Sequence, residues 1–117
     1  MDWLVEVADE AVVKAVRPDL RGLVTLGVRG VIVTARSASP ERDFVSRFFA
    51  PGVGVDEDPV TGSAHCALAP YWAGKLGKTA LTGYQASTRG GTVLCTVKGS
   101  RVVLGGRAVT VLRAKLL

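Results

Sequence analysis

The sequence predicts an α+β domain in which a curled, mostly antiparallel sheet or open barrel wraps around one central buried helix. Residues 62–76 read as a helix whose apolar and small side chains cover nearly the whole circumference. A helix that is apolar on all sides is expected to be buried on all sides. Alternating and β-branched runs lie before and after this helix, and short glycine turns join the later ones. A sheet that covers such a helix all round must curl.

The N-terminal half is expected to alternate strands with short helices. Residues 3–7 alternate as a strand does, and Asp9 is placed to cap a helix that runs to residue 16. Pro18 ends that helix, and residues 19–27 are expected to form another helical turn. Two β-branched or aromatic runs bounded by turn residues then predict strands at 30–36 and 43–49.

The strand at 43–49 is expected to be buried on both faces. Its alternation places three side chains on one face, Phe44, Ser46 and Phe48. The opposite face carries Val45, Arg47 and Phe49. Since aromatic residues occur on both faces, the sequence predicts packed layers on each side of the sheet.

The central helix is predicted to run from Gly62 to Leu76. Gly77 suits the left-handed conformation that commonly follows a helix, and Pro70 inside the segment is expected to kink or loosen one turn. Four strand-like runs joined by glycine-containing turns follow, and they predict antiparallel hairpins. These runs are residues 79–86, 91–98, 101–105 and 107–113.

The 117 residues, 48% of them apolar, predict a single domain over residues 1–117 with a real hydrophobic core. No stretch reaches the ~18 apolar residues needed to cross a bilayer, and the acidic N-terminus lacks the basic segment of a signal peptide. Cys66 and Cys95 match no metal or redox spacing and are expected to be small core residues. These features predict a soluble, cytoplasmic protein with no membrane partner.

The two halves of the chain differ in charge. The formal net charge is +5, yet all 10 acidic residues lie at or before Asp58. Residues 59–117 carry 8 Lys and Arg and no acid. A basic half favours an anionic partner, and we expect a small carboxylate metabolite. Nucleic acid is not expected, because no aromatic residues lie among the charges as stacking platforms. The alternative is a solvated surface, since the basic residues are dispersed.

The chemistry is expected at residues 56–65, Asp-Glu-Asp-Pro-Val-Thr-Gly-Ser-Ala-His. The first N–H groups of a helix lack intrahelical acceptors, and the helix dipole makes that end positive. Asp58 beside this end is the candidate general acid or base, and Glu57 is a possible second carboxylate. The alternative is that both acids only complement the dipole. Three residues with little side chain can let a substrate anion approach the N–H groups: Gly62, Ser63 and Ala64.

Two further residues are possible members of the site. His65 is the sole histidine, and residues two apart on a helix do not face each other, so a triad with Ser63 is not expected. We expect His65 to be a core or interface residue, and we expect neither a metal nor a cofactor. Arg89, before two glycines, points either to an anion or to solvent from a hairpin turn.

The motifs resemble, in order and spacing, the PhzF-like family of phenazine biosynthesis, relatives of diaminopimelate epimerase. The resemblance covers the whole chain but only about the second half of a typical member. It implies a domain of the diaminopimelate epimerase-like fold, two of which enclose an active site, and cofactor-independent isomerase chemistry. The matching segments are residues 43–51, 57–65, 71–72, 76–78, 85–87 and 89–91.

Carried over by position, the resemblance implies that Asp58 lies near the substrate and that Gly62 and Ser63 donate to its carboxylate or oxyanion. It gives His65 no firm role. The main acid/base glutamate of the family belongs to the first domain, which residues 1–117 do not contain. We therefore expect a homodimer, or a separate chain that supplies the N-terminal half. Whether the chain is an enzyme stays open, since a non-catalytic binding module or an inactive half-gene product is the alternative.

Overall fold

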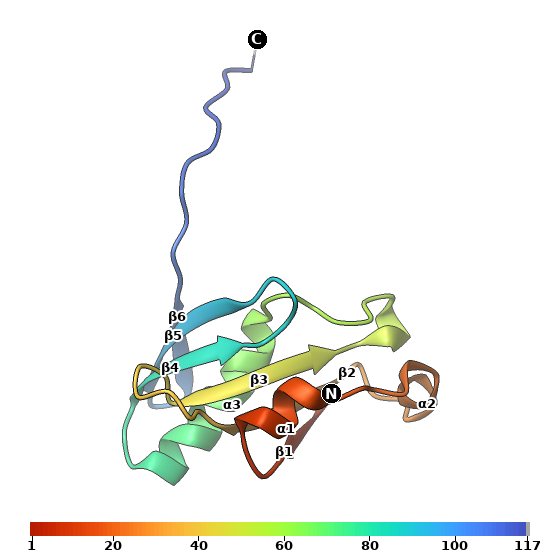
Figure 1. The fold of residues 1–117 in the computed structure, drawn as a ribbon. Coiled ribbons are helices and arrows are strands. Elements are labelled where there is room, and N and C mark those ends of the chain that lie inside the picture. Colours follow the sequence, from red (N-terminus) through yellow and green to blue (C-terminus); the bar gives the residue numbers. More distant parts are fainter. Residues whose placement is uncertain (117) are drawn as a thin grey trace.

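Six strands lie in chain order across one mixed sheet, with helices on both faces (Figure 1). The computed structural model describes residues 1–116. The strands are β1 (Asp2–Glu6), β2 (Gly30–Arg36), β3 (Phe44–Phe49), β4 (Ala80–Gln85), β5 (Gly91–Lys98) and β6 (Arg101–Gly105). The helices are α1 (Glu10–Ala15), α2 (Leu20–Thr25) and α3 (Gly62–Leu76), with a 3-10 turn η1 (Pro51–Val53).

The strand directions follow from the connections. Helices join β1 to β2 and β3 to β4, and both of these pairs are parallel, as crossover connections require. Tight connections join the other neighbours, and those three pairs are antiparallel. The predicted α+β fold with a curled open sheet around a helix is confirmed. The sheet does not close, so β1 and β6 are its edges.

Alternating side chains of β2 and β3 build two cores, one on each side of the sheet. Toward α3, Ile32, Phe44 and Phe48 pack with Leu68 and Trp72. Toward α1 and α2, the opposite faces of the same strands form the second cluster with residues Val13, Val31, Val33, Ala35, Val45 and Phe49. The predicted burial of both faces is confirmed, because β2 and β3 are covered by a helical layer on each side.

The two short helices begin where aspartate caps them. The Asp9 carboxylate accepts a hydrogen bond from the Val12 N–H at 2.9 Å, and Asp19 accepts from the Gly22 N–H at 3.1 Å. Each bond satisfies one backbone donor that the first helical turn leaves without a partner. The cap predicted at Asp9 and the helical turn predicted within 19–27 are confirmed.

Helix α3 has the predicted bounds, Gly62 to Leu76. Gly77 ends it with φ of 66°, a left-handed conformation that glycine adopts without steric cost. The helix continues through Pro70. Pro70 lacks the N–H that would bond the carbonyl of Cys66, so the helix lacks one backbone hydrogen bond at this turn.

One face of α3 is exposed, and the expectation of burial on all sides is wrong. The sheet covers the face that carries Ala64, Leu68 and Trp72. The other face is accessible because no strand bridges the gap between β6 and β1. Cys66, expected in the core, lies on this exposed face, whereas Cys95 is buried as expected. The exposed positions include Ser63, Cys66, Ala67, Pro70 and Gly74.

The strand predicted at 107–113 is absent from the described part of the chain. After β6 ends at Gly105, residues 106–116 project from the body as an extended tail (Figure 1). A strand needs a neighbour that accepts and donates its backbone hydrogen bonds. None of the other described strands reaches this segment, so it does not form a strand although its residues favour one.

Within residues 1–116, none of the helices is both long enough and apolar enough to span a lipid bilayer.

Candidate functional site

The loop between β3 and α3 holds Asp58 through its backbone. The Asp58 N–H donates to the Phe48 carbonyl at 3.0 Å, and the Asp58 carbonyl accepts from Gln85 Nε2 at 2.6 Å. The Asp58 carboxylate accepts a hydrogen bond from the hydroxyl of Thr61. These contacts fix the carboxylate beside the first residue of α3, which is the position that the sequence suggested.

Thr61, the residue at the N-cap position of α3, connects this loop to the sheet. Its N–H donates to Gln85 Oε1 at 2.8 Å, and its hydroxyl accepts from Gln85 Nε2 at 3.1 Å. Its carbonyl accepts from His65 Nδ1 at 2.8 Å. Gln85 is fully buried, so these bonds form in an environment where an unpaired group would be costly.

The bond between Thr61 and Asp58 leaves the helix without a side-chain cap. A threonine at this position ordinarily accepts a hydrogen bond from the second or third helical N–H. Here the Thr61 side chain makes no such capping bond. Gly62 and Ser63 are exposed residues in the first turn, at the positive end of the helix dipole. Ala64 differs, because its methyl group is buried in the core.

Arg29 brings a positive charge to the same helical turn. Its Nη2 donates to the Ser63 hydroxyl at 3.0 Å, and its guanidinium also pairs with the Asp2 carboxylate. The pairing with Arg29 lowers the pKa of Asp2. Sequence reasoning missed Arg29, because 34 positions separate it from Ser63 and no motif surrounds it. Only the return of the chain into β2, next to the edge strand β1, places it there.

Glu57 is bound by another arginine. Arg47 on β3 donates to both of its carboxylate oxygens, at 2.7 and 2.9 Å. Arg47 also donates to the Val16 carbonyl at 2.8 Å, at the end of α1. The structure thus places Glu57 in an ion pair that anchors the loop, on a different side of the loop from the Thr61 contact of Asp58.

His65 lies in the interior, fully buried against the ring of Phe44 with centroids 5.8 Å apart. Burial lowers its pKa, and the bond to the Thr61 carbonyl opposes this only in part. Its Nε2 atom has no hydrogen-bond partner among the described residues. The interpretation of His65 as a core residue agrees with this position. Within residues 1–116, no cluster of three or more His, Cys, Asp or Glu side chains is arranged to hold a metal.

Arg89 lies on an open groove of about 930 Å³ that begins next to the loop, at Val60. Gly91 packs so closely on Val60 that an added Cβ would lie 2.3 Å from its side chain. A larger residue at 91 would therefore displace the side chain of Val60. Arg89 itself is exposed, and a second arginine, Arg107, lines the groove.

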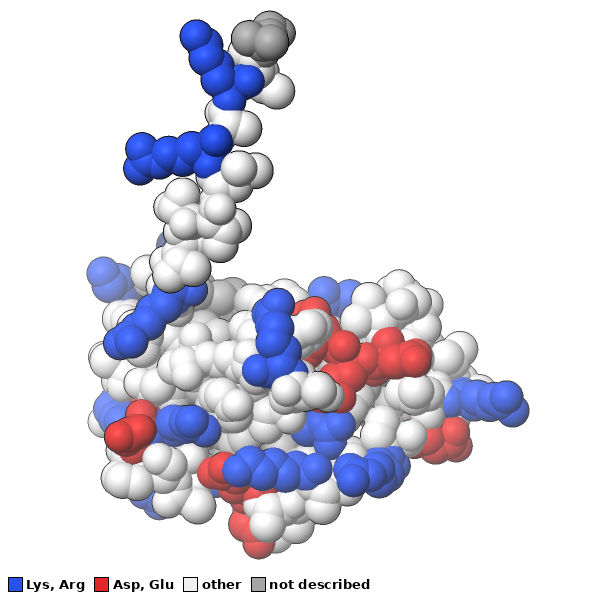
Figure 2. Space-filling model, turned by 45° about the horizontal axis from the view of Figure 1, so that its top comes forward, with Lys and Arg blue, Asp and Glu red and all other residues white. Residues whose placement is uncertain are grey.

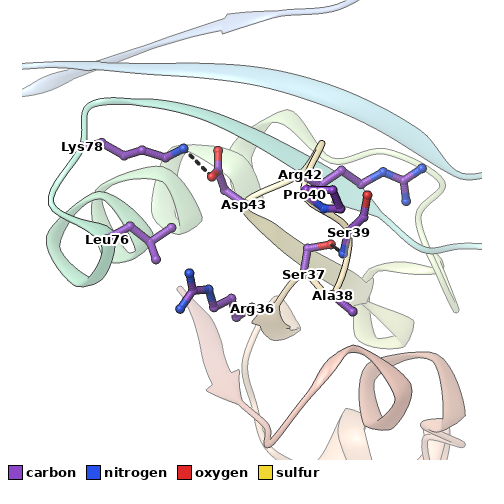
Figure 3. Close-up of a pocket in the computed structure, with 9 residues that line it drawn as sticks. All are labelled: Arg36, Ser37, Ala38, Ser39, Pro40, Arg42, Asp43, Leu76 and Lys78. Carbon is purple, nitrogen blue, oxygen red and sulfur yellow. Dashed lines mark hydrogen bonds and ion pairs between the residues drawn. The ribbon is translucent and has the colours of Figure 1, made fainter.

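A second cavity, of about 380 Å³, lies beside the other end of α3 and is lined in part by Leu76 and Lys78 (Figure 3). Two of the three cations that line it, Lys78 and Arg42, already have partners. Lys78 pairs with Asp43 at 2.5 Å, and Arg42 lies over the ring of Tyr84 at 3.9 Å. We therefore place the candidate site at the N-terminal end of α3 and not in this cavity.

The surface reflects the uneven charge of the chain. Basic residues extend along the tail, while acidic residues gather on the body, as Figure 2 shows. The site itself combines both signs, because Asp58 bonds the N-cap residue Thr61 and Arg29 bonds Ser63 in the first turn of the same helix. Such an arrangement can bind an anion and offer it a proton-transferring group.

Comparison with known proteins agrees with the expected family. Residues 1–114 match the family described as PhzC-PhzF, phenazine biosynthesis-like protein. An uncharacterized isomerase of Pseudomonas aeruginosa is 55% identical over 113 residues, which are 97% of this chain and 42% of that protein. An uncharacterized isomerase of Halalkalibacterium halodurans is 52% identical over 116 residues, which are 99% of this chain and 44% of that protein.

Solved structures give the same result. A PhzF-family phenazine biosynthesis protein of Enterococcus faecalis superposes with a TM-score of 0.84 at 47% identity, over 88% of this chain and 39% of that one. A putative PhzC/PhzF protein of Clostridium difficile superposes with a TM-score of 0.77 at 36% identity, over 95% of this chain and 45% of that one. The chain thus spans less than half the length of these relatives. With its fold and its loop motif matched together, this chain belongs to the PhzC-PhzF family of phenazine biosynthesis-like proteins.

Proposed function

We propose that this chain is the carboxylate-binding part of a PhzF-like isomerase and that it supports cofactor-independent proton transfer on a small carboxylate substrate. The observation that carries the proposal is the hydrogen bond from Thr61 to Asp58. The Thr61 hydroxyl donates to Asp58 and accepts from Gln85, and it makes no capping bond to α3, so a carboxylate lies at a helix end that has no side-chain cap. One interaction thus prepares both an anion site and an acid/base group.

The substrate carboxylate binds the N–H groups of Gly62 and Ser63, with Arg29 adding a positive charge near Ser63. When a proton leaves the carbon next to this carboxylate, negative charge develops on its oxygens. Fixed N–H donors at a helix N-terminus stabilise this additional charge more than they stabilise the singly charged carboxylate before proton loss. Asp58 lies beside these donors and exchanges a proton with the substrate as general acid or base.

A second proton-transferring group is needed on the opposite face of the carbon, and a partner supplies it in this proposal. Residues 1–117 span 42% of one relative and 44% of another. The partner is either a second copy of this chain or a separate chain that carries the N-terminal half with its glutamate. Asp58 and the helix end remain the contribution of this chain in both cases.

The binding step can be tested with Ser63→Pro, which removes one N–H, and Ser63→Ala, which keeps it. Proline is tolerated in the first helical turn, so the helix survives both changes. Titration with a panel of cyclic and amino-acid-like carboxylates, followed by NMR at Gly62, should show roughly tenfold weaker binding for Ser63→Pro only, a loss of about 1.4 kcal/mol. Equal affinities in the two variants would show that the N–H of residue 63 does not bind the carboxylate, and would contradict a site at this helix end.

The chemical step is tested by deuterium incorporation from D₂O into the bound carboxylates, with the partner chain present. Asp58→Asn should slow incorporation by about 10²–10⁴-fold while the affinity stays within a factor of a few. The second candidate function is a binding module without catalysis. It is favoured if unaltered protein binds carboxylates but Asp58→Asn changes neither the affinity nor the exchange.

A further inference from the structure

The open sheet leaves a slot over the exposed face of α3. We define the slot by Cys66, Ala67, Pro70 and Gly74, which lie between the two edge strands. Both edges reach α3: Glu6 of β1 bonds Tyr71 and Lys75, and Leu104 of β6 belongs to the core that α3 forms with the sheet. One more strand laid over the slot would continue the sheet around the helix.

The tail, residues 106–116, has the composition of a strand and no strand partner within residues 1–116. Alternation puts Val109 and Val111 on one side and Thr110 on the other. The two valines are 84% and 90% exposed, and Leu112 is 78% exposed. Exposed side chains of this kind on a β-prone segment mark a surface that pairs with another element.

The dimensions of the tail and the slot agree. A strand of the seven residues 107–113 is about 23 Å long, and the 15-residue helix α3 is about 22 Å long. The slot carries only small side chains and one proline, so a strand can approach the helix closely enough for Val109 and Val111 to contact it. A larger residue in this row would hold the strand away.

Charge does not oppose the contact. Three basic residues and no acid lie on the tail: Arg107, Arg113 and Lys115. The β1 rim of the slot carries two closed ion pairs, Asp2 with Arg29 and Glu6 with Lys75, so it is close to neutral. Figure 2 shows basic side chains along the tail and side chains of both signs on the body.

We propose that two copies of this chain exchange tails, so that the tail of each copy forms a strand over the slot of the other. The tail projects from the body after β6 (Figure 1), and in this proposal it meets the slot of another molecule. Because every copy carries both surfaces, a twofold axis satisfies both contacts at once. The added strand pairs with an exposed sheet edge, a common mode of strand recognition. This inference does not depend on the proposed chemistry.

Cross-linking tests the exchange directly, because Cys66 lies in the slot while Cys95 is buried. Cysteine is introduced by Val109→Cys or Val111→Cys, in an equal mixture of ¹⁴N- and ¹⁵N-labelled chains under mild oxidation. We expect a disulfide that joins a tail peptide to the Cys66 peptide, with about half of the pairs of mixed label. The Cys66→Ala background should abolish it. Pairs without mixed label would show contact within one chain and overturn the proposal.

Sedimentation provides the second measurement, and it needs no disulfide. The unaltered chain should sediment at twice its own mass at micromolar concentration. Val109→Lys combined with Val111→Lys should weaken dimerisation at least about 100-fold, because two buried valines are replaced by charges. Thr110→Lys, on the other side of the strand, is the matched control and should leave the dimer intact. A monomeric unaltered chain, or a dimer that survives the valine substitutions, would contradict the exchange.

Discussion

The two ends of α3 are built in opposite ways. At the C-terminal end, Gly77 donates to the Ala73 carbonyl, and Lys75 and Lys78 both pair with carboxylates. At the N-terminal end, the Thr61 side chain bonds Asp58 and leaves the first N–H groups uncapped. The difference separates two tasks. Apolar packing and closed hydrogen bonds stabilise one end, while a buried polar network surrounds the other end, which has no side-chain cap.

The largest effect on stability is expected at Trp72, in the packed half of α3. Its ring stacks on Phe44 and its indole N–H donates to the Thr34 hydroxyl at 3.0 Å, with 2% of the residue exposed. Trp72→Ala should lower the free energy of unfolding by about 3–5 kcal/mol, measured by urea denaturation. Trp72→Phe keeps most of the packing and should cost clearly less. Similar losses in both variants would show that the hydrogen bond, and not the packing, stabilises this half.

A smaller effect is expected at Gln85, in the polar network. Gln85→Leu leaves the Thr61 N–H and the Asp58 carbonyl without partners. We expect a loss of about 2–3 kcal/mol and faster hydrogen exchange confined to the loop and the first turn of α3. Gln85→Glu keeps the acceptor for Thr61 and is the matched control. If amide hydrogen exchange at Gly77 became faster to the same extent, the two ends of α3 would not be independent in stability.

The polar end should also respond to pH through His65. Its pKa is lowered from 6.5 by burial. Between the two pKa values, His65 therefore binds a proton in the unfolded chain but not in the folded chain. The free energy of unfolding should therefore fall as the pH decreases below 6.5, and the loss should grow until the folded pKa is reached. Denaturation between about pH 7.5 and about pH 5 measures this slope. His65→Phe should remove it, and an unchanged slope in that variant would assign it to other groups.

The smallest effect is expected at Lys75, whose partner Glu6 lies at the surface. Their side chains are 46% and 33% exposed, and solvent screens such pairs strongly. Lys75→Met should shift the melting temperature only slightly, and added salt should remove the difference. A large shift would mean that the contact between β1 and α3 depends on this ion pair more than on packing.

The sequence was sufficient for the elements whose signals are local. The bounds of α3, β2, β5 and β6 agree with their glycine and alternation patterns. Burial required tertiary information, because Cys66 is apolar by type and yet lies where the sheet fails to close. The prediction of a strand at 107–113 is wrong for the same reason, since strand pairing depends on a neighbouring strand that residue type does not reveal.

The same distinction between local signals and tertiary information applies to the residues of the candidate site. Asp58 and Gly62 could be proposed from the sequence because one short motif contains both. Arg29 and the bonds of Gln85 to the loop could not, since these residues come from β-sheet neighbours distant in sequence. Their roles depend on strand order, which places the segment before β2 and the end of β4 around one helical turn.

Arg47 joins the loop before α3 to the helical layer on the α1 side of the sheet. Its guanidinium binds Glu57 in the loop and the Val16 carbonyl at the end of α1, and it covers the ring of Phe49. The segment that carries Asp58 is thereby connected to the outer helical layer. A molecule that bound α1 from outside would consequently pull on this segment, so the outer surface would be coupled mechanically to the proposed site.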